Sequence, residues 1–155
     1  MNKKVIITRG LSGAGKTTWS KQYVKDHPDF LRISRDDIDF MLSDNYPKKK
    51  EQLIFRTRDY LIGTALSQGF DLVLDETYLV PDKIEGLNLS LKAYTLFWHK
   101  HLDVQIQDFL DVQIEQCIKR DKERFFHVGE EFIKRYYKEY VEPLLTNRGI
   151  TEWTV

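Results

Sequence analysis

The strongest chemical signal in the sequence is a glycine-rich run that follows a β-branched segment. It fits the pattern G-x-x-x-x-G-K-[ST] with one extra internal glycine and consists of Gly10, Leu11, Ser12, Gly13, Ala14, Gly15, Lys16 and Thr17, with Thr18 directly after it. Such a loop lets backbone N–H groups surround an anion, and the next helix adds the positive end of its dipole. Lys16 can reach the β- and γ-phosphates of ATP, and the Thr17 hydroxyl can bind Mg²⁺. A chance glycine turn is the alternative, but the flanking strand and helix are the context that the motif requires.

A second candidate group is the carboxylate pair Asp75 and Glu76, which follows the apolar run 72–74. A carboxylate at the carboxyl end of a parallel strand beside a phosphate loop can hold Mg²⁺ through water or orient a substrate. We therefore assign Asp75 to metal and substrate binding, with Glu76 able to take either role. A strand-end aspartate without a function is the alternative.

The segment Arg35-Asp36-Asp37 follows another apolar run and should lie at the same edge of the sheet. Phosphoryl transfer to a hydroxyl benefits from a carboxylate that accepts the hydroxyl proton, and Asp36 could do this. The chemistry leaves an alternative open, in which Asp36 is the N-cap of a short helix and Asp37 favours its first turn.

Arginines late in the chain form a fourth candidate group. Arg120 and Arg124 are four residues apart and therefore share a helix face. Arginines placed over a nucleotide can neutralise the charge of a transferred phosphoryl group. The alternative is a solvated helix in which Arg120 pairs with Glu115 or Glu123.

The elements that must position these groups alternate along the chain. Strands are predicted over 5–9, 30–34, 71–74 (ending in Asp75) and 103–110, with a possible last strand over 150–155. Helices are predicted over 16–25, 36–42, 49–68 (closed by Gly69), 81 toward 101, 114–122 and 130–145. This order predicts an α/β three-layer sandwich with a mainly parallel sheet.

Composition limits the function classes. The chain has 155 residues, of which 41% are hydrophobic and 13% aromatic, so one folded domain is expected and disorder is excluded. Lys and Arg (24) balance Asp and Glu (24), so any contact with nucleic acid must be local. Cys117 is the only cysteine, which excludes an internal disulfide and argues against a cysteine zinc site. The apolar run after Met1 is too short for a signal sequence or membrane span, so we expect a cytoplasmic protein without membrane contact.

On these motifs, the chain resembles the kinase domain of bacteriophage-type 5′-hydroxyl polynucleotide kinases over most of its length. The similar segments are 10–19 with Trp19, 30–37, the lysine run 48–50, Asp75 to Leu79 (D-x-T-N-L in relatives), and 109–112 through Arg124. The resemblance implies a P-loop NTPase fold with an arginine-bearing lid near 120–130. It implies that Asp36 is the general base and that Arg120 and Arg124 contact the nucleotide phosphates. We expect the acceptor to contact Arg35, Asp36, Asp75 and Thr77.

Three departures from that family qualify the resemblance. The family has an arginine three residues after the base that grips the acceptor's 3′-phosphate, whereas this chain has Asp39, which would repel it. That phosphate is then held by Arg35 or by lysines 48–50, or is absent. Tyr78 replaces the usual asparagine. The phage enzyme's C-terminal phosphatase domain has no expected counterpart here.

The sequence thus predicts an ATP- and Mg²⁺-dependent kinase over residues 1–155 that phosphorylates the 5′-hydroxyl ends of DNA or RNA. Lys16, Asp36 and Arg124 are its expected catalytic residues, and Thr17 and Asp75 its expected metal ligands. Two alternatives remain: a small-molecule or nucleoside kinase on the same fold, which neutral charge and Asp39 favour, and a non-catalytic nucleotide-binding switch.

Overall fold

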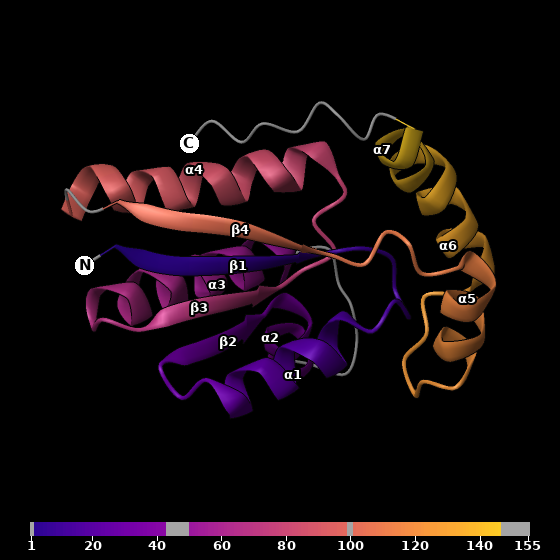
Figure 1. The fold of residues 1–155 in the computed structure, drawn as a ribbon, viewed down its shortest axis with the longest axis horizontal. Coiled ribbons are helices and arrows are strands. Elements are labelled where there is room, and N and C mark those ends of the chain that lie inside the picture. Colours follow the sequence, from indigo (N-terminus) through magenta and orange to yellow (C-terminus); the bar gives the residue numbers. More distant parts are fainter. Residues whose placement is uncertain (1, 43–49, 99–100, 147–155) are drawn as a thin grey trace.

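The protein, seen in a computed structural model that describes residues 2–42, 50–98 and 101–146, is built around a parallel sheet. Its strands are β1 (Lys3–Arg9), β2 (Phe30–Ser34), β3 (Asp71–Asp75) and β4 (Leu102–Asp108), in the order β2-β3-β1-β4. All three strand pairs are parallel. The described residues therefore confirm the predicted α/β fold with a parallel sheet (Figure 1).

Helices flank both faces of this sheet. They are α1 (Lys16–Asp26), α2 (Arg35–Leu42), α3 (Glu51–Ser67), α4 (Pro81–Trp98), α5 (Ile114–Lys122), α6 (Glu130–Tyr136) and α7 (Glu142–Thr146). Ile54 and Ile62 of α3 and Leu87 of α4 pack with Val5 and Ile7 in the main core. Successive strand residues point to opposite faces of the sheet. Ile6, between Val5 and Ile7 on β1, therefore faces the layer that contains α1.

A second, smaller core joins the glycine-rich loop to the helices at the carboxyl end of the strands. Leu11 and Ala14 of the loop pack with Cys117 of α5, Ile133 of α6 and Val141 beyond it. Figure 1 shows α5, α6 and α7 together at that end of the sheet. The phosphate loop is therefore held between the sheet and the lid helices.

The structure corrects several predicted boundaries. The helix predicted over 130–145 is interrupted by a π-helical turn, Tyr137–Val141, between α6 and α7. In a regular α-helix, positions 133 and 141 would lie about 80° apart around the axis. The wider turn brings Val141 toward the face of Ile133, and both are buried. The sequence period alone did not reveal this insertion.

The strand predicted over 103–110 ends at Asp108, because Leu110 leaves the sheet to join the second core. The predicted end of the helix after Pro81 falls partly on residues 99–100, and the possible strand over 150–155 and lysines 48 and 49 also lie outside the described residues. Within the described ranges, none of the helices combines the length and apolar character that crossing a membrane requires.

Candidate active site

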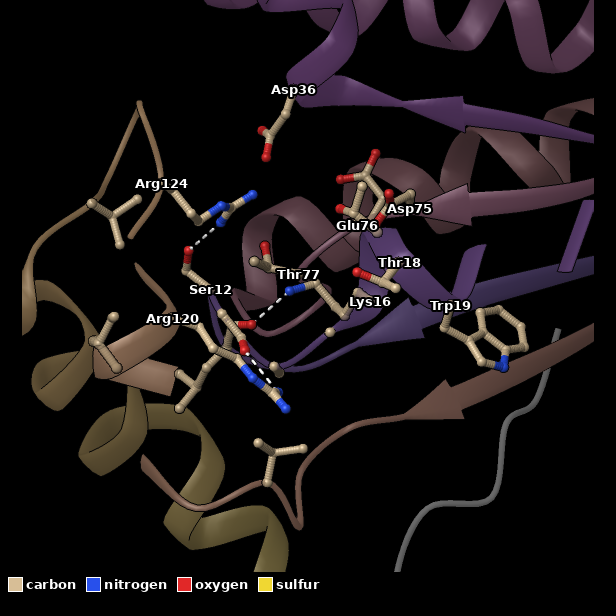
Figure 2. A pocket seen from close by; sticks show the side chains of 18 of the residues that line it. Ser12, Lys16, Thr18, Trp19, Asp36, Asp75, Glu76, Thr77, Arg120 and Arg124 are labelled. Carbon is tan, nitrogen blue, oxygen red and sulfur yellow. Dashed lines mark hydrogen bonds between the residues drawn. The ribbon is translucent and has the colours of Figure 1, made fainter. Parts of the chain in front are cut away.

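A cavity of about 920 Å³ opens at the carboxyl end of the strands. Its walls come from the glycine-rich loop, the first turn of α2, the end of β3, α5 and the loop before α6. Figure 2 shows Lys16, Asp36 and Arg124 directed into the same space from three different elements. This volume is at the upper end of the range for small-molecule sites, so it suits a nucleotide together with part of a second substrate.

The extra glycine of the loop, Gly13, is explained by the lid. Gly13 has φ +79°, and a Cβ at this position would lie 2.3 Å from the backbone oxygen of Cys117 on α5. Gly15, with φ 99°, precedes the first turn of α1. The loop can therefore curl into a cradle only because these positions carry no side chain, which fits a bound phosphate.

Lys16 is the buried cation of the cradle. Its Nζ donates a hydrogen bond of 2.7 Å to the backbone oxygen of Leu11. Burial lowers the pKa of Lys16 to about 8, while the charges of Asp75 and Asp36 oppose that shift. A triphosphate beside Lys16 would favour the charged form in the same way that these carboxylates do.

Asp75 ends β3 and is held from below by two other elements. Its Oδ2 accepts hydrogen bonds from Ser20 Oγ of α1 at 3.0 Å and from Nε and Nη2 of Arg32 on β2 at 3.0 and 2.5 Å. Because all three bonds go to Oδ2, the carboxylate is fixed in orientation. Arg32 also forms an ion pair with Asp37, so it links Asp75 to the first turn of α2.

Asp36 is not the N-cap of α2. Ser34 Oγ takes that part, since it accepts a hydrogen bond of 3.3 Å from the backbone N–H of Asp37. The Asp36 side chain is 73% exposed, and it lines the cavity. Arg35 Nη1 donates to Asp36 Oδ1 at 3.5 Å, which is a weak contact. The capping alternative is therefore removed, and Asp36 is available to a ligand.

The lid arginines contact the phosphate loop and not Glu115 or Glu123. Arg120 Nη1 lies 3.3 Å from the backbone oxygen of Gly13, and Arg124 Nη1 lies 3.0 Å from Ser12 Oγ (Figure 2). Both arginines are thus already placed at the mouth of the cradle.

Asp121 lies between these arginines and pins the lid. It is 1% exposed and accepts hydrogen bonds from Ser12 Oγ and from the backbone N–H groups of Val128 and Gly129. This carboxylate therefore ties the phosphate loop to both ends of the segment 121–129. Sequence reasoning missed it among the mixed charges, although its spacing of four residues from the apolar Cys117 marks the buried face of α5.

Most of the remaining predicted residues also line the cavity, but Gly10 and Lys50 are not part of its wall. Thr17, Thr18 and Thr77 are part of its wall, and the backbone oxygen of Thr77 accepts a hydrogen bond from Gly10. Glu76 lines it as well, but Arg58 lies 3.3 Å from its Oε1, and burial raises the pKa of this carboxyl. Tyr78 instead points to α4, where its hydroxyl donates to Asn88 Oδ1.

The donor set at Thr17 and Asp75 fits Mg²⁺. In the described residues no group of three or more His, Cys, Asp or Glu side chains could hold a metal on its own. Mg²⁺ in nucleotide sites typically takes one or two carboxylate or hydroxyl ligands and completes its shell with phosphates and water. A hydroxyl and an oriented carboxylate beside a phosphate cradle match that requirement.

Comparison with known proteins identifies a family and a relative of this chain. A family model described as "AAA domain" matches residues 5–143. The chain is 25% identical over 147 residues to an L-seryl-tRNA(Sec) kinase from Methanococcus maripaludis, covering 90% of this chain and 53% of that protein. It thus spans about half the length of this curated relative.

Solved structures share the fold. A Pnkp1/Rnl/Hen1 RNA repair complex contains a chain with TM-score 0.69 and 19% identity, covering 99% of this chain and 47% of that one. A second Pnkp1/Rnl/Hen1 complex gives TM-score 0.66 and 20% identity over 77% and 39% of the two chains. A gluconokinase from Sinorhizobium meliloti 1021 gives 0.53 and 12% over 87% and 73%. At these identities the likeness concerns the fold.

Proposed function

We propose, from the premise that this chain belongs to the AAA domain family and has a P-loop kinase fold, that it transfers the γ-phosphate of ATP to the 5′-hydroxyl end of DNA or RNA. One observation carries the proposal: an exposed carboxylate, Asp36, lines the same cavity as the phosphate cradle, Lys16 and the lid arginines. A nucleotide-binding switch has no need of a carboxylate and a lid arginine that face each other across a triphosphate site.

The chemistry follows from these positions. Lys16 and the loop N–H groups bind the phosphates of ATP, and Arg120 and Arg124 add positive charge from the lid side. Asp36 accepts the proton of the acceptor hydroxyl while the hydroxyl oxygen forms a bond to the γ-phosphorus. The bond from the γ-phosphorus to the β–γ bridging oxygen breaks, and ADP leaves. Thr17 and Asp75 would hold Mg²⁺, which when bound neutralises charge on the phosphate oxygens.

The choice of a polynucleotide acceptor is supported by two features. The Arg35-Asp36-Asp37 segment and the two lid arginines follow the order and spacing of 5′-hydroxyl polynucleotide kinases. The fold likeness to chains of Pnkp1/Rnl/Hen1 RNA repair complexes agrees with it. DNA or RNA ends are accordingly the proposed partners, and a cytoplasmic location stays a prediction.

A second candidate is a kinase that acts on another hydroxyl. Asp39 favours it, because a carboxylate one turn from Asp36 disfavours an acceptor that carries a phosphate near its reactive end. The likeness to an L-seryl-tRNA(Sec) kinase and to a gluconokinase structure agrees with such an acceptor. The two candidates share the ATP site and differ at α2.

A comparison of acceptors tests the assignment. The purified chain is incubated with ATP and Mg²⁺ in separate reactions that contain equal concentrations of a 5′-OH oligonucleotide, a free nucleoside, seryl-tRNA or gluconate, and ADP release is measured in each. Preferred phosphorylation of the oligonucleotide is expected. Preference for another acceptor selects the second candidate, and ATP binding without acceptor-dependent ADP release selects the switch.

Variants test the residues. Asp36→Asn should bind ATP normally and lose about 10²- to 10⁴-fold in transfer rate, the usual worth of a general base. Lys16→Met should abolish turnover while the fold stays intact. Retained transfer by either variant would reassign that residue.

A further inference from the structure

Aromatic side chains gather on α2, which carries Asp36, and on the loop between α5 and α6, which carries Arg124. Phe40 of α2 is 50% exposed, and Phe126 of the loop is 49% exposed. Their ring centroids lie 4.8 Å apart, and Phe125, 90% exposed, packs edge-on against Phe126 at 4.7 Å. Three large rings left in water at one place are unusual on a protein surface and indicate a binding function.

The position of these rings connects them to the reacting end of the site. Phe40 lies four residues after Asp36 and so occupies the same face of α2, one turn farther along. Phe126 lies two residues after Arg124 in the chain. The Phe40–Phe126 pair therefore spans from the helix of the proposed base to the segment of the lid arginine. The two rings are not part of the cavity wall, so they could be reached only by a substrate that extends beyond the cavity from Asp36.

The charges around the rings restrict what can lie on them. The first turns of α2 carry three carboxylates, Asp36, Asp37 and Asp39, and one cation, Arg35; Asp37 is paired with Arg32 and Asp36 lies 3.5 Å from Arg35. The excess of carboxylates on these turns disfavours a phosphate-rich segment of the acceptor. An uncharged flat ring has no such penalty, and stacking on an aromatic side chain contributes about 1–3 kcal/mol for each base.

We propose that Phe40 and Phe126 form a stacking platform for the 5′-terminal nucleobase of the acceptor. This inference rests on the proposed polynucleotide kinase function and adds how the acceptor is held where its expected phosphate-binding arginine is replaced by Asp39. The terminal base lies on the rings, its 5′-hydroxyl faces Asp36, and the strand continues away from α2.

The test compares two acceptors with each variant. One is a single-stranded 5′-OH oligonucleotide, and the other is the same oligonucleotide with an abasic 5′-terminal residue. Phe40→Ala and Phe126→Ala should each raise the KM for the intact oligonucleotide about tenfold and leave the KM for ATP unchanged, whereas Phe40→Trp should retain most of the affinity. On the abasic acceptor the wild-type protein should already show the raised KM, and the alanine variants should add nothing.

Phe97→Ala is the matched control, because Phe97 is also an exposed ring in contact with another aromatic, Trp98, but lies near the far end of α4. It should leave both KM values unchanged. A binding assay independent of turnover uses 2-aminopurine as the 5′-terminal base, whose fluorescence should fall on binding to wild type and not to Phe40→Ala.

The outcomes separate the inference from the function on which it rests. Equal losses on the intact and abasic acceptors would mean that the rings only hold the lid against α2, and this would overturn the platform alone. Normal KM values in the alanine variants would do the same. If the wild-type protein phosphorylates no oligonucleotide, the polynucleotide kinase assignment is overturned and the platform with it.

Discussion

Arg32 and Asp75 form an ion pair at the cavity of the candidate active site, with Arg32 Nη2 2.5 Å from Asp75 Oδ2. Both side chains are largely buried, at 10% and 3% exposure. Arg32 also pairs with Asp37, next to the proposed base. A single arginine on β2 therefore orients the carboxylate proposed for Mg²⁺ and anchors the helix that carries Asp36.

Replacing Arg32 should impair the metal site before the nucleotide site. Arg32→Lys keeps a charge but cannot serve Asp75 and Asp37 together, so the Mg²⁺ concentration for half-maximal turnover should rise several-fold while the KM for ATP changes little. Arg32→Met leaves a buried carboxylate without its partner and should cost about 3 kcal/mol of unfolding free energy. Magnesium titrations and thermal melts measure the two effects.

The Arg9–Asp108 pair offers the control for this prediction. It is also an arginine–aspartate pair between neighbouring strand ends, with contacts of 2.5 and 2.7 Å, but its aspartate, Asp108, is not part of the cavity wall, whereas Asp75 is. Arg9→Lys should leave the Mg²⁺ requirement unchanged. An equal shift in both variants would mean that Arg32 acts only through general stability.

The lowered pKa of Lys16 makes ATP affinity depend on pH. With a pKa of about 8, Lys16 is mostly charged at pH 7 and mostly neutral at pH 9. Binding that requires the charged form should therefore weaken about tenfold between these pH values. Calorimetric titration of wild type and Lys16→Met with ATP tests this, since the variant should bind weakly with no comparable slope.

Lys16 should also make the stability of the ligand-free protein depend on pH, and this stability should rise with pH, whereas ATP affinity falls. Burial lowers the pKa of Lys16 from 10.5 to about 8, so the unfolded chain binds more protons between these values and stability rises with pH there. Below pH 8, the burial of charged Lys16 lowers the unfolding free energy by about 3 kcal/mol. Denaturant unfolding of wild type relative to Lys16→Met from pH 7 to 10 isolates this contribution; a constant difference would contradict the shift.

The elements that carry the site could be predicted because their signals are local. The strand 30–34 has the bounds that its apolar run indicated, and Gly69, with φ +91°, follows the end of α3 as expected of a C-terminal cap. The phosphate loop is recognised from its own sequence motif, G-x-x-x-x-G-K-[ST]. These features depend on neighbours in the chain and not on tertiary contacts.

The contacts that organise the site could not be predicted, since they join distant residues. Arg32 and Asp75 are 43 residues apart, and Ser12 and Asp121 are 109 apart. Arg32 left one signal, a charge inside an otherwise apolar strand of a parallel sheet, where a buried partner is required. The residue that caps the N-terminus of α2 could not be predicted either. Ser34 and Asp36 are both good capping residues, and only the fold decides between them.

Gly13 should be irreplaceable for a steric reason. In Gly13→Ala the new Cβ would lie 2.3 Å from the Cys117 backbone oxygen, so α5 or the loop must move and φ +79° becomes strained. We expect a lower melting temperature and loss of ATP binding. Gly86→Ala is the contrast: it lies inside α4 with nothing within 4 Å of its Cβ, so it should raise the melting temperature by about 2 °C. Intact ATP binding in Gly13→Ala would show that the loop adapts.

Charge reversal at Asp39 tests how α2 selects the acceptor. This residue lies three positions after Asp36 on the same helix, where 5′-hydroxyl polynucleotide kinases have a phosphate-binding arginine. Asp39→Arg replaces repulsion by attraction, so the KM for an acceptor with a 3′-phosphate should fall about tenfold, while an acceptor without that phosphate should gain little. Asp39→Asn, which only removes the charge, should give an intermediate value. The comparison uses a nucleoside 3′-phosphate and the matching nucleoside as acceptors. Equal changes in KM for the two acceptors would mean that Asp39 does not face the acceptor's 3′-phosphate. Other residues of the site would then have to bind that phosphate.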